Sequence, residues 1–250
     1  MADRIERLKV CLNGGRTRAE YPAVPVTPAE LATSAAQAVT AGAEAVHAHP
    51  RDGDGAESLD AGDVAAAVAA VRQACPGTPV GVTTGLWIAD GDPDRRLAVV
   101  ARWADLPVAA RPDFASVNVS EPGFTELVQA LALAGVSVEV GVWSVADAEA
   151  LARDASWFRI LVEILDVPAE SAVAAADAVL ARLDALGVVG PRLLHGEGDA
   201  CWPLVAHAGR LGLATRIGLE DTTVGPAGEP VVDNADLVRR ALTVWSAARR

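Results

Sequence analysis

Short, almost unbroken apolar runs alternate along the chain with longer stretches of helical character. The apolar runs predict strands at residues 8–12, 45–49, 78–85, 114–119, 136–142, 159–165, 192–198 and 214–219. The stretches between them predict helices at residues 27–42, 60–74, 92–103, 124–134, 170–186, 202–211 and 234–247. Strands that are buried on both faces lack the polar alternation of half-exposed strands. The pattern therefore indicates a parallel sheet whose faces are covered by helices.

The repeat of strand and helix suits one closed barrel. A chain of 250 residues matches the usual length of a (β/α)8 barrel. No linker-like stretch rich in glycine, serine or charge interrupts the series, so we predict a single TIM-barrel domain over residues 1–250. The alternative is an open, doubly wound sheet, which would bind a dinucleotide through a Gly-x-Gly-x-x-Gly turn after the first strand. Residues 13–18, Asn-Gly-Gly-Arg-Thr-Arg, do not supply that turn.

Composition and charge narrow the class of protein further. Hydrophobic residues make up 51% of the chain, yet no run approaches the ~20 apolar residues that span a membrane. The first residues contain no apolar signal core, so we expect a cytoplasmic protein. A net charge of −12 disfavours non-specific nucleic-acid binding. An anionic substrate would then need local arginines, and Arg16, Arg18 and Arg51 are the candidates.

Two histidines end the second predicted strand. Side chains alternate between the faces of a strand, so His47 and His49 point to the same side. A lone His-x-His pair is equally compatible with one hydrogen-bonded core histidine and one surface histidine. Three features favour a metal site: the pair ends a strand, the chain has only four histidines, and Glu220 with Asp221 ends a second strand far downstream.

Polar side chains gather at the carboxyl ends of the predicted strands, where the active sites of such barrels lie. They are Asn13, Arg16, His47, His49, Thr83, Thr84, Ser116, Asn118, Glu139, Glu163, His195, Glu197, Arg216, Glu220 and Asp221. The eighth strand closes beside the first, so Glu220 is expected to converge with His47 and His49. Two imidazoles, one carboxylate and an open position form a catalytic zinc site, although iron, manganese and cobalt accept the same ligands. Such an ion acts as a Lewis acid on a carbonyl.

Two further residues at the end of the eighth strand suggest proton chemistry. Asp221 is the candidate for proton abstraction, since it adjoins a proposed metal ligand but points differently. An alternative role for Asp221 is an N-cap of the turn through Thr222 and Thr223. Arg216 lies five residues earlier, where it could orient Asp221 or clamp a substrate carboxylate. A buried ion pair inside the barrel is the alternative for Arg216.

Three blocks of sequence, in order, resemble one enzyme family. They are residues 22–28 (Pro-Ala-Val-Pro-Val-Thr-Pro), residues 41–52, which contain the His-x-His pair, and residues 216–221 followed by Gly228 and residues 234–238. By these blocks the chain resembles the zinc-dependent β-keto acid cleavage enzymes, the family of 3-keto-5-aminohexanoate cleavage enzyme. The resemblance implies a zinc-holding barrel that takes a β-keto acid and acetyl-CoA to acetoacetate and a new acyl-CoA. It also implies a homo-oligomer.

The same resemblance implies roles for individual residues. His47, His49 and Glu220 would bind zinc, and Asp221 would remove a proton from the α-carbon of the keto acid. The resulting carbanion attacks the thioester, CoA passes to the former ketone carbon, and a retro-Claisen step releases acetoacetate. Arg216 and Thr83 would assist catalysis. The predicted substrate contacts are Arg16, Thr84, Ser116, Asn118 and Glu139.

Two departures from the family pattern concern the substrate. The aminohexanoate enzyme has one glutamate on strand one and another on strand five, where this chain has Arg16 and Gly141. Glu139 remains, two residues before Gly141. The two missing carboxylates suit a substrate ammonium group, which a cation in their place would repel. We therefore expect a neutral or anionic β-keto acid, such as a keto diacid, and not an amino-substituted one.

The part of the chain that would shape the CoA side also departs from the family. The segment between strands six and seven is shorter than in full-length members, and the family's Gly-x-Gly-Arg loop corresponds here to residues 195–198, His-Gly-Glu-Gly. Acetyl-CoA is the expected co-substrate. The first alternative is a metal-dependent hydrolase or lyase that works without CoA, and CoA dependence of turnover separates the two. The second alternative is a barrel that binds a small anion without chemistry.

Overall fold

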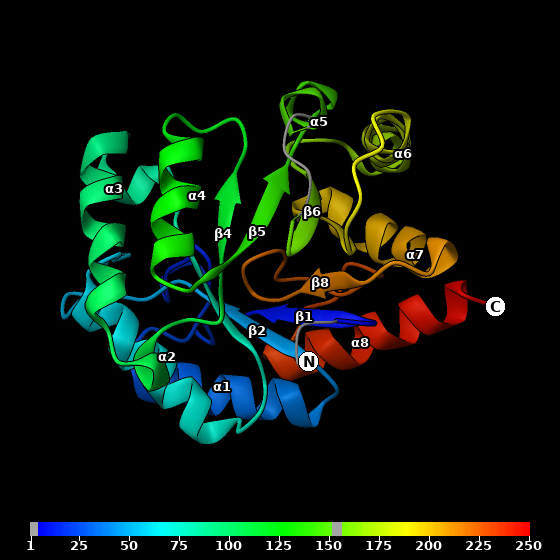
Figure 1. Cartoon of the computed structure of the whole chain (residues 1–250). Coiled ribbons are helices and arrows are strands. Elements are labelled where there is room, and N and C mark those ends of the chain that lie inside the picture. Colours follow the sequence, from blue (N-terminus) through cyan, green and yellow to red (C-terminus); the bar gives the residue numbers. More distant parts are fainter. Residues whose placement is uncertain (1–4, 152–156) are drawn as a thin grey trace.

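Eight parallel strands form one sheet that curls into a barrel (Figure 1). The structure is a computed structural model, and it describes residues 5–151 and 157–250. The strands are β1 (Leu8–Cys11), β2 (Ala45–Ala48), β3 (Val80–Thr83), β4 (Phe114–Asn118), β5 (Ser137–Val142), β6 (Arg159–Ile164), β7 (Arg192–Gly196) and β8 (Thr215–Ile217). Neighbours pair in the order β7-β6-β5-β4-β3-β2-β1-β8. The (β/α)8 barrel expected from the sequence is confirmed.

The barrel closes between β7 and β8. A parallel bridge joins Leu193 and Ala214, and the Leu194 amide donates to the Ala214 carbonyl at 2.9 Å. After β8 the chain passes directly against β1 at Gly218. An added Cβ there would lie 1.7 Å from the Cys11 carbonyl oxygen. Because only glycine fits this approach, Gly218 brings the end of β8 next to the end of β1.

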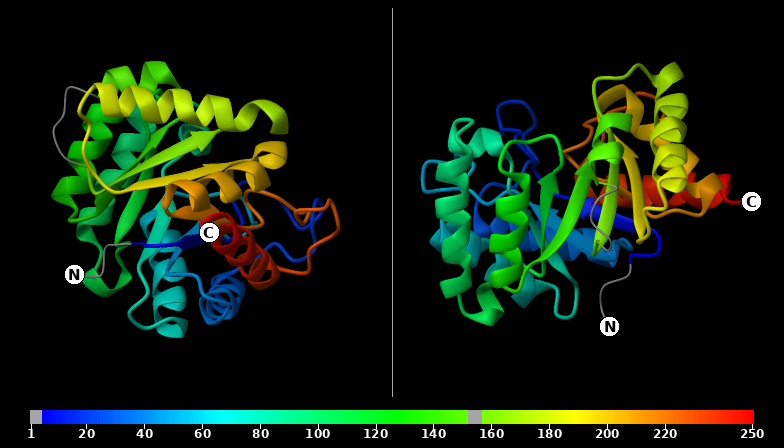
Figure 2. Two further views of the ribbon diagram at one scale, coloured as in Figure 1. Left: turned by 90° about the vertical axis from the view of Figure 1, so that its right-hand side faces the viewer. Right: turned by 45° about the horizontal axis from the view of Figure 1, so that its top comes forward.

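Helices cover the outside of the barrel (Figure 2). They are α1 (Pro28–Thr40), α2 (Ala61–Ala74), α3 (Pro93–Ala101), α4 (Phe124–Leu133), α5 (Val145–Leu151), α6 (Ala169–Ala185), α7 (Cys201–Leu211) and α8 (Asn234–Ala248). Within the ranges described, no helix has both the length and the apolar character of a membrane span.

The sequence pattern did not reveal α5. In the described residues this helix is seven residues long. It begins where the Asp147 carboxylate accepts hydrogen bonds from the backbone amides of Trp143 and Ser144, at 2.8 and 3.0 Å. So short a helix contains too few apolar positions for the helical period to stand out. Local capping therefore decides where α5 starts.

A capping box fixes the start of α1 and the loop before it. The Thr27 hydroxyl accepts the Glu30 amide at 3.3 Å, and the Glu30 carboxylate accepts the Thr27 amide at 2.9 Å. Arg18, in the preceding loop, also pairs with Glu30. The loop between β1 and α1 is thus tied to the helix that follows it.

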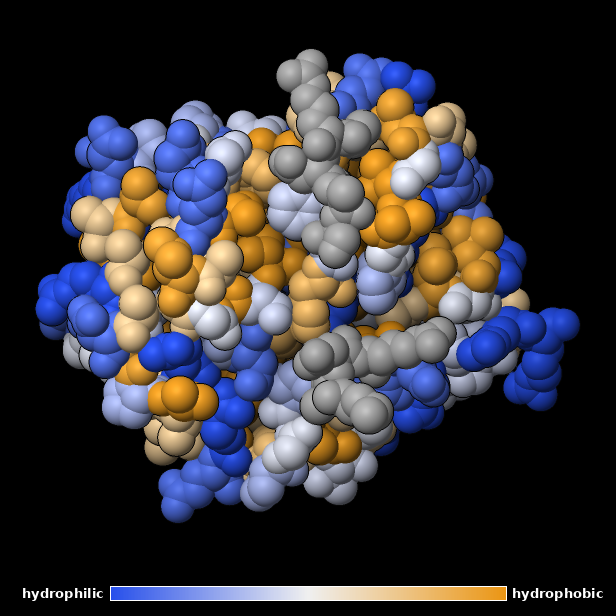
Figure 3. All heavy atoms as spheres, viewed as in Figure 1, coloured by the Kyte–Doolittle hydropathy of each residue, from blue (hydrophilic) through white to orange (hydrophobic). Residues whose placement is uncertain are grey.

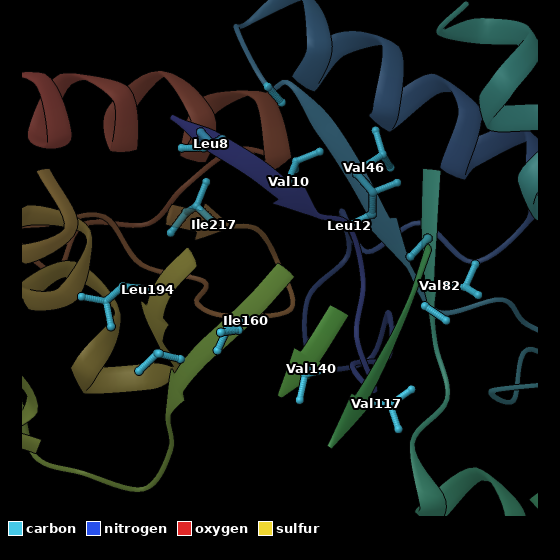
Figure 4. Close-up of a cluster of buried hydrophobic side chains, with 14 of the residues drawn as sticks. Leu8, Val10, Leu12, Val46, Val82, Val117, Val140, Ile160, Leu194 and Ile217 are labelled. Carbon is cyan, nitrogen blue, oxygen red and sulfur yellow. The ribbon is translucent and has the colours of Figure 1, made fainter. Parts of the chain in front are cut away.

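Side chains of the strands alternate between two layers. Outward-facing residues such as Val10, Val46, Val140 and Ile217 are buried against the helices in the main hydrophobic core (Figure 4). On the outer surface, hydrophilic and hydrophobic side chains are interspersed over the face shown in Figure 3. A second, smaller apolar cluster on the inward-facing side consists of Ile5, Ala45, Phe114, Leu161, Leu193 and Ala214.

A charged cluster lies inside the barrel, near the amino-terminal ends of β1 and β6. Lys9 binds Glu139, and Arg159 Nη1 donates to Glu139 Oε1 at 2.6 Å. All three side chains are buried, and the Arg159 guanidinium lies 5.0 Å from the centre of the Phe114 ring. Burial disfavours the Glu139 carboxylate, but Lys9 and Arg159 outweigh it and hold its pKa well below the usual range. Glu139 is therefore engaged by two cations of the barrel interior.

Candidate active site

A cavity of about 260 Å³ lies at the carboxyl ends of the strands. Its wall contains ten of the fifteen strand-end residues singled out in the sequence: Arg16, His47, His49, Thr83, Ser116, Asn118, Glu163, Glu197, Arg216 and Glu220. Trp87 and Trp143 also line it. Asn13, Thr84, Glu139, His195 and Asp221 do not belong to this wall.

Three side chains from β2 and the segments after β2 and β8 face one another in the cavity. The ring centres of His47 and His49 are 5.2 Å apart. Glu220 Oε2 lies 3.8 Å from His47 Nε2 and 3.6 Å from His49 Nε2. One donor atom of each residue lies within 4.8 Å of the other two. Ligands bound to one zinc ion at ~2.0–2.2 Å stand about 3–4 Å apart, so this arrangement can hold such an ion.

Two asparagines position the segments that carry these ligands. Asn13 accepts the His49 amide and donates to the His49 carbonyl, both at 2.9 Å. Asn234, at the start of α8, accepts the Leu219 amide and donates to the Leu12 carbonyl, both at 2.8 Å. Each side chain thus replaces a missing backbone partner where a strand has ended. The ends of β1, β2 and β8 are held together in this way.

The electrostatics of the three ligands suit a divalent cation. Glu220 Oε2 is buried and has no hydrogen-bond partner among the described residues. Burial opposes ionisation of Glu220, but Arg216 and the two histidines outweigh it and hold its pKa well below the usual range. Burial lowers the pKa of His47 to about 3, so its imidazole is neutral and offers a lone pair. Burial acts in the same direction on His49, but Glu220 and Glu57 outweigh it and raise its pKa to about 9. The cluster therefore favours added positive charge.

Arg216, on β8, is surrounded by carboxylates. Its Nη2 lies 2.7 Å from Asp221 Oδ1, 3.0 Å from Glu220 Oε1 and 3.1 Å from Glu163 Oε1. Burial raises the pKa of Asp221, although Arg216 opposes the shift. Asp221 Oδ2 is buried without a hydrogen-bond partner in the described chain. Arg216 thus orients Asp221 through buried ion pairs, which combines two of the roles considered from the sequence.

Glu163 places a further carboxylate on the cavity wall. Trp143 Nε1 donates to Glu163 Oε2 at 2.6 Å, and His195 Nε2 lies 2.8 Å from Glu163 Oε1. His195 Nδ1 lies 3.7 Å from Asp221 Oδ1. Burial disfavours the Glu163 carboxylate, but Arg216 and His195 hold its pKa below the usual range. Glu163 and His195 are therefore parts of the charge network around Arg216.

Arg16 belongs to the loop between β1 and α1. Its buried Nε has no hydrogen-bond partner within residues 5–151 and 157–250. Arg51 braces the backbone of this loop, because its guanidinium donates to the Gly14 carbonyl and, at 3.1 Å, to the Arg16 carbonyl. Of the arginines expected to serve an anionic substrate, Arg16 lines the cavity, whereas Arg51 supports the loop.

A model of the beta-keto acid cleavage enzyme family matches residues 7–250. The chain belongs to this family. A 3-keto-5-aminohexanoate cleavage enzyme from Fusobacterium nucleatum subsp. nucleatum is 36% identical over 69 residues, which are 28% of this chain and 25% of that protein. The resemblance seen in the sequence blocks is thereby confirmed.

Solved structures of ObcA share the fold. Apo ObcA gives a TM-score of 0.66 at 20% identity, over 87% of this chain and 61% of that chain. The binary complex of ObcA with oxaloacetate gives 0.63, and the ternary complex with a C4-CoA adduct and oxalate gives 0.60. In both complexes the match covers 91% of this chain and 62% of that chain. This β-keto acid cleavage family member thus spans about six tenths of the ObcA chains and a quarter of the curated relative.

In this family member, close packing against Asn118 explains why residue 141 is a glycine. A Cβ at this position would lie 2.2 Å from Asn118 Oδ1. Asn118 lines the cavity and donates to Glu121 at 3.0 Å, so a glutamate at position 141 would displace it. Glu139 lies one inward position deeper, beside Arg159 in the strand register. The structure does not bring Glu139 to the cavity.

The hydroxyl residues at the ends of β3 and β4, including Thr84 just after β3, divide into two groups. Thr83 and Ser116 line the cavity. Thr84 is turned to the neighbouring strand, where its hydroxyl donates to the Ser116 carbonyl at 2.6 Å. Thr83 Oγ1 also accepts the Gly85 amide at 3.1 Å, which shapes the turn after β3. Thr84 therefore braces β4 and does not face the cavity.

Glu57 and Trp87 contact His49 but were missed in the sequence. Glu57 lies in the loop after β2 and Trp87 in a short 3₁₀ helix, Leu86–Ala89, so no strand or α-helix period indicates the direction of either side chain. Glu57 is paired with Arg51 by an isolated antiparallel bridge, so the loop after β2 folds back on itself. The available signal was a carboxylate eight residues after a metal-binding histidine, since such histidines commonly donate their second ring nitrogen to a carboxylate.

Proposed function

We propose that this protein cleaves a neutral or anionic β-keto acid in a zinc-dependent reaction with acetyl-CoA, and releases acetoacetate and a new acyl-CoA. The observation that carries the proposal is the convergence of His47, His49 and Glu220 in one cavity of a chain that belongs to the family. These three residues would hold the zinc ion. When bound, the ion would serve as a Lewis acid that polarises a substrate carbonyl. A homo-oligomer remains our expectation from the family.

Asp221 would take the proton from the α-carbon of the keto acid. Its Oδ1 is held by Arg216 Nε and Nη2, at 3.0 and 2.7 Å, while Oδ2 has no partner in the described chain. A carboxylate oxygen without donors is the more basic one. Because Asp221 itself does not line the cavity, the α-carbon would have to approach it beside Arg216 and Glu220, which do.

The steps balance with one proton kept on the enzyme. The α-carbon loses its proton to Asp221, and the carbanion forms a carbon–carbon bond to the thioester carbonyl carbon as CoA thiolate leaves. The thiolate then bonds to the former ketone carbon. Cleavage of the bond between this carbon and the α-carbon gives the new acyl-CoA and the acetoacetate carbanion, which takes the proton back from Asp221. Arg216 would keep Asp221 oriented in both proton transfers.

The cavity wall supports the proposed substrate class. Arg16 contributes a guanidinium whose Nε has no partner in the described chain, and Gly141 leaves no room for a carboxylate beside Asn118. A substrate carboxylate would gain charge-assisted hydrogen bonds from Arg16, whereas an ammonium group would be repelled. Thr83, Ser116 and Asn118 would contact the substrate as polar groups of the same wall.

Schiff-base chemistry is not open to this chain. The sequence contains a single lysine, Lys9. Its side chain is fully buried and pairs with Glu139 inside the barrel. A lyase that forms a Schiff base needs a lysine amine at the substrate carbonyl. The metal site would instead supply a route of cleavage that needs no lysine amine.

A second candidate function is metal-dependent cleavage of the keto acid without CoA. One observation favours it. A second hollow, of about 570 Å³, shares Arg16 and Glu197 with the cavity and is also lined by Asp166 and Asp199. The phosphates of CoA would meet the carboxylates of Asp166 and Asp199 and one arginine there, while burial raises the pKa of Glu197 to about 7, and this balance is unfavourable electrostatically.

A panel assay separates these functions. Zinc-loaded protein is given neutral, dicarboxylic and amino-substituted β-keto acids with acetyl-CoA, and acetoacetate is measured. Acetoacetate from the neutral or dicarboxylic acids, and its loss in His47→Ala, is the expected result. If protein that holds one metal ion per chain forms no acetoacetate but consumes a keto acid without acetyl-CoA, the second candidate replaces the first.

A further inference from the structure

Glu57 contacts one of the two metal-site histidines. Glu57 Oε1 lies 2.5 Å from His49 Nδ1, on the side of the ring opposite the nitrogen that faces Glu220. The side chain of His49 is 5% exposed and that of Glu57 is 15% exposed, so water competes little for this contact. The contact leaves His49 Nε2 directed at the position where His47, His49 and Glu220 converge.

Trp87 holds the other oxygen of Glu57. Trp87 Nε1 donates to Glu57 Oε2 at 3.0 Å. The indole ring also stacks against His49, with ring centres 6.3 Å apart and an interplanar angle of 27°. Gly85 makes room for this ring, because a Cβ there would lie 2.2 Å from Trp87 Cη2. Although Trp87 is 51% exposed at the cavity, its ring is thus held by contacts with Glu57 and His49.

The two histidines differ in this respect. His47 Nδ1 is buried and has no hydrogen-bond partner among the described residues. His49 Nδ1 has a carboxylate partner, which itself has a tryptophan partner. A carboxylate on the second ring nitrogen fixes the tautomer and the ring orientation of a metal-binding histidine and makes it a stronger ligand. The orientation of His49 is therefore determined by groups outside the three ligands.

We propose that Glu57 and Trp87 are positioning residues for the metal site. Glu57 holds a proton on His49 Nδ1, so that Nε2 is the ring nitrogen that binds the ion. Trp87 keeps the Glu57 carboxylate in the plane of the His49 ring edge through its indole N–H. The inference rests on the metal site of the proposed function, but it concerns affinity for the ion alone and needs no substrate.

The test is a competition titration of metal-free protein with Zn²⁺ against a chelator of known affinity. Glu57→Gln keeps the shape and removes the charge, and it should weaken Zn²⁺ binding by about 10–100-fold. Trp87→Phe keeps a ring and removes the N–H, and Gly85→Ala pushes the ring away. Both should weaken binding by about 3–10-fold, as the loss of one hydrogen bond to Glu57 predicts.

Matched controls carry the same chemical changes elsewhere. Glu44→Gln changes a carboxylate that binds Arg7 Nε at 2.7 Å, and Trp202→Phe removes an indole N–H bound to the Val224 carbonyl at 2.9 Å. Neither residue lines the cavity, so both variants should bind Zn²⁺ as the unmodified chain does. The visible absorption of the Co²⁺-loaded protein should shift in Glu57→Gln and stay unchanged in the controls. A merely structural role of Glu57 would not move this spectrum.

The outcomes separate the two proposals. If the unmodified chain binds Zn²⁺ and Glu57→Gln and Trp87→Phe bind it equally well, the positioning role is wrong while the proposed function stands. If the unmodified chain and the controls hold no ion, both proposals are wrong. Should Glu57→Gln fail to fold, Trp87→Phe and Gly85→Ala decide the question, since neither removes a buried charge.

Discussion

Arg216 and Asp221 are joined by two hydrogen bonds that end on the same carboxylate oxygen. Arg216 Nε and Nη2 both donate to Asp221 Oδ1, at 3.0 and 2.7 Å, and Oδ2 is left without a partner in the described chain. The pairing fixes the direction of the Asp221 side chain and occupies only one of its two carboxylate oxygens. Glu163 competes for the same guanidinium at 3.1 Å and, unlike Asp221, lines the cavity. Two carboxylates beside Arg216 are therefore candidates for the base, and two variants distinguish them.

Asp221→Asn should abolish proton abstraction, because the amide cannot accept the proton. We expect exchange of the α-hydrogens of a keto acid into D₂O, followed by NMR, to fall by about 10²–10⁴-fold toward the uncatalysed rate. Zinc content should stay near one ion per chain. Glu163→Gln should lower the exchange rate less, since it only loosens Arg216. The reverse order of the two variants would move the role of base to Glu163.

Arg16→Ala should raise KM for a dicarboxylic keto acid and change KM for a neutral one little. A hydrogen bond between charged partners contributes about 1.5–3 kcal/mol, which corresponds to roughly a 10–100-fold change in KM. Arg18→Ala is the matched control, because Arg18 lies in the same loop but pairs with Glu30 at the surface. Equal KM changes for neutral and dicarboxylic substrates would show that Arg16 does not read the substrate's charge.

The convergence of the metal ligands could be predicted from the sequence because strand geometry and strand order bring the segments that carry them together. Residues two apart in a strand share a face, so His47 and His49 point into the barrel together. β1 is flanked by β2 on one side and β8 on the other, which brings Glu220 to the same place. The turn after β8, which passes Gly218 and directs the Glu220 side chain into the cavity, was not predictable from strand geometry.

The contacts that were missed depend on loops or on register. Glu57 and Trp87 reach His49 only because the loop after β2 folds back at residues 51–57 and a short 3₁₀ helix, Leu86–Ala89, follows β3. Glu139 was expected at the cavity. The sequence indicated where β5 ends, but it did not indicate the register of β5 against β4. Gly141 pairs with Asn118 and Glu139 with Ser116, one inward position deeper. A shift of two residues along a strand changes the level of a side chain and not its face.

Gly14→Ala should weaken metal binding. Gly14 has a φ of +55°, and an added Cβ would lie 2.5 Å from Glu220 Cγ. We expect the alanine to displace Glu220 and to weaken Zn²⁺ binding at least about tenfold, as the loss of a well-oriented ligand does. Gly77→Ala is the control, since Gly77 has a φ of +82° with nothing within 4 Å of an added Cβ. Both variants should lose about 1–2 kcal/mol of stability from backbone strain, and only Gly14→Ala should lose metal affinity.

Glu139→Gln should destabilise the fold without changing KM. The substitution leaves Lys9 buried without its counter-ion, and breaking such a buried pair costs about 3–5 kcal/mol. Urea unfolding at pH 7 measures the loss, and KM of the folded fraction should agree with that of the unmodified chain within about twofold. A large rise in KM with unchanged stability would instead place Glu139 in contact with the substrate.

The ion pairs that Glu139 forms with Lys9 and Arg159 make the stability of the fold depend on pH. Burial opposes ionisation of Glu139, but Lys9 and Arg159 hold its pKa in the folded chain well below the ordinary value of 4.5. The unfolded chain therefore binds a proton at Glu139 at a higher pH than the folded chain does, so acid favours unfolding. The contribution is complete above pH 4.5 and is lost progressively as the pH falls toward the folded pKa. We expect the difference in unfolding free energy between the unmodified chain and Glu139→Gln to be constant from pH 7 to about 5.5 and to shrink below about pH 4.5. A difference that grows on acidification would mean that the Glu139 carboxyl is protonated in the folded barrel.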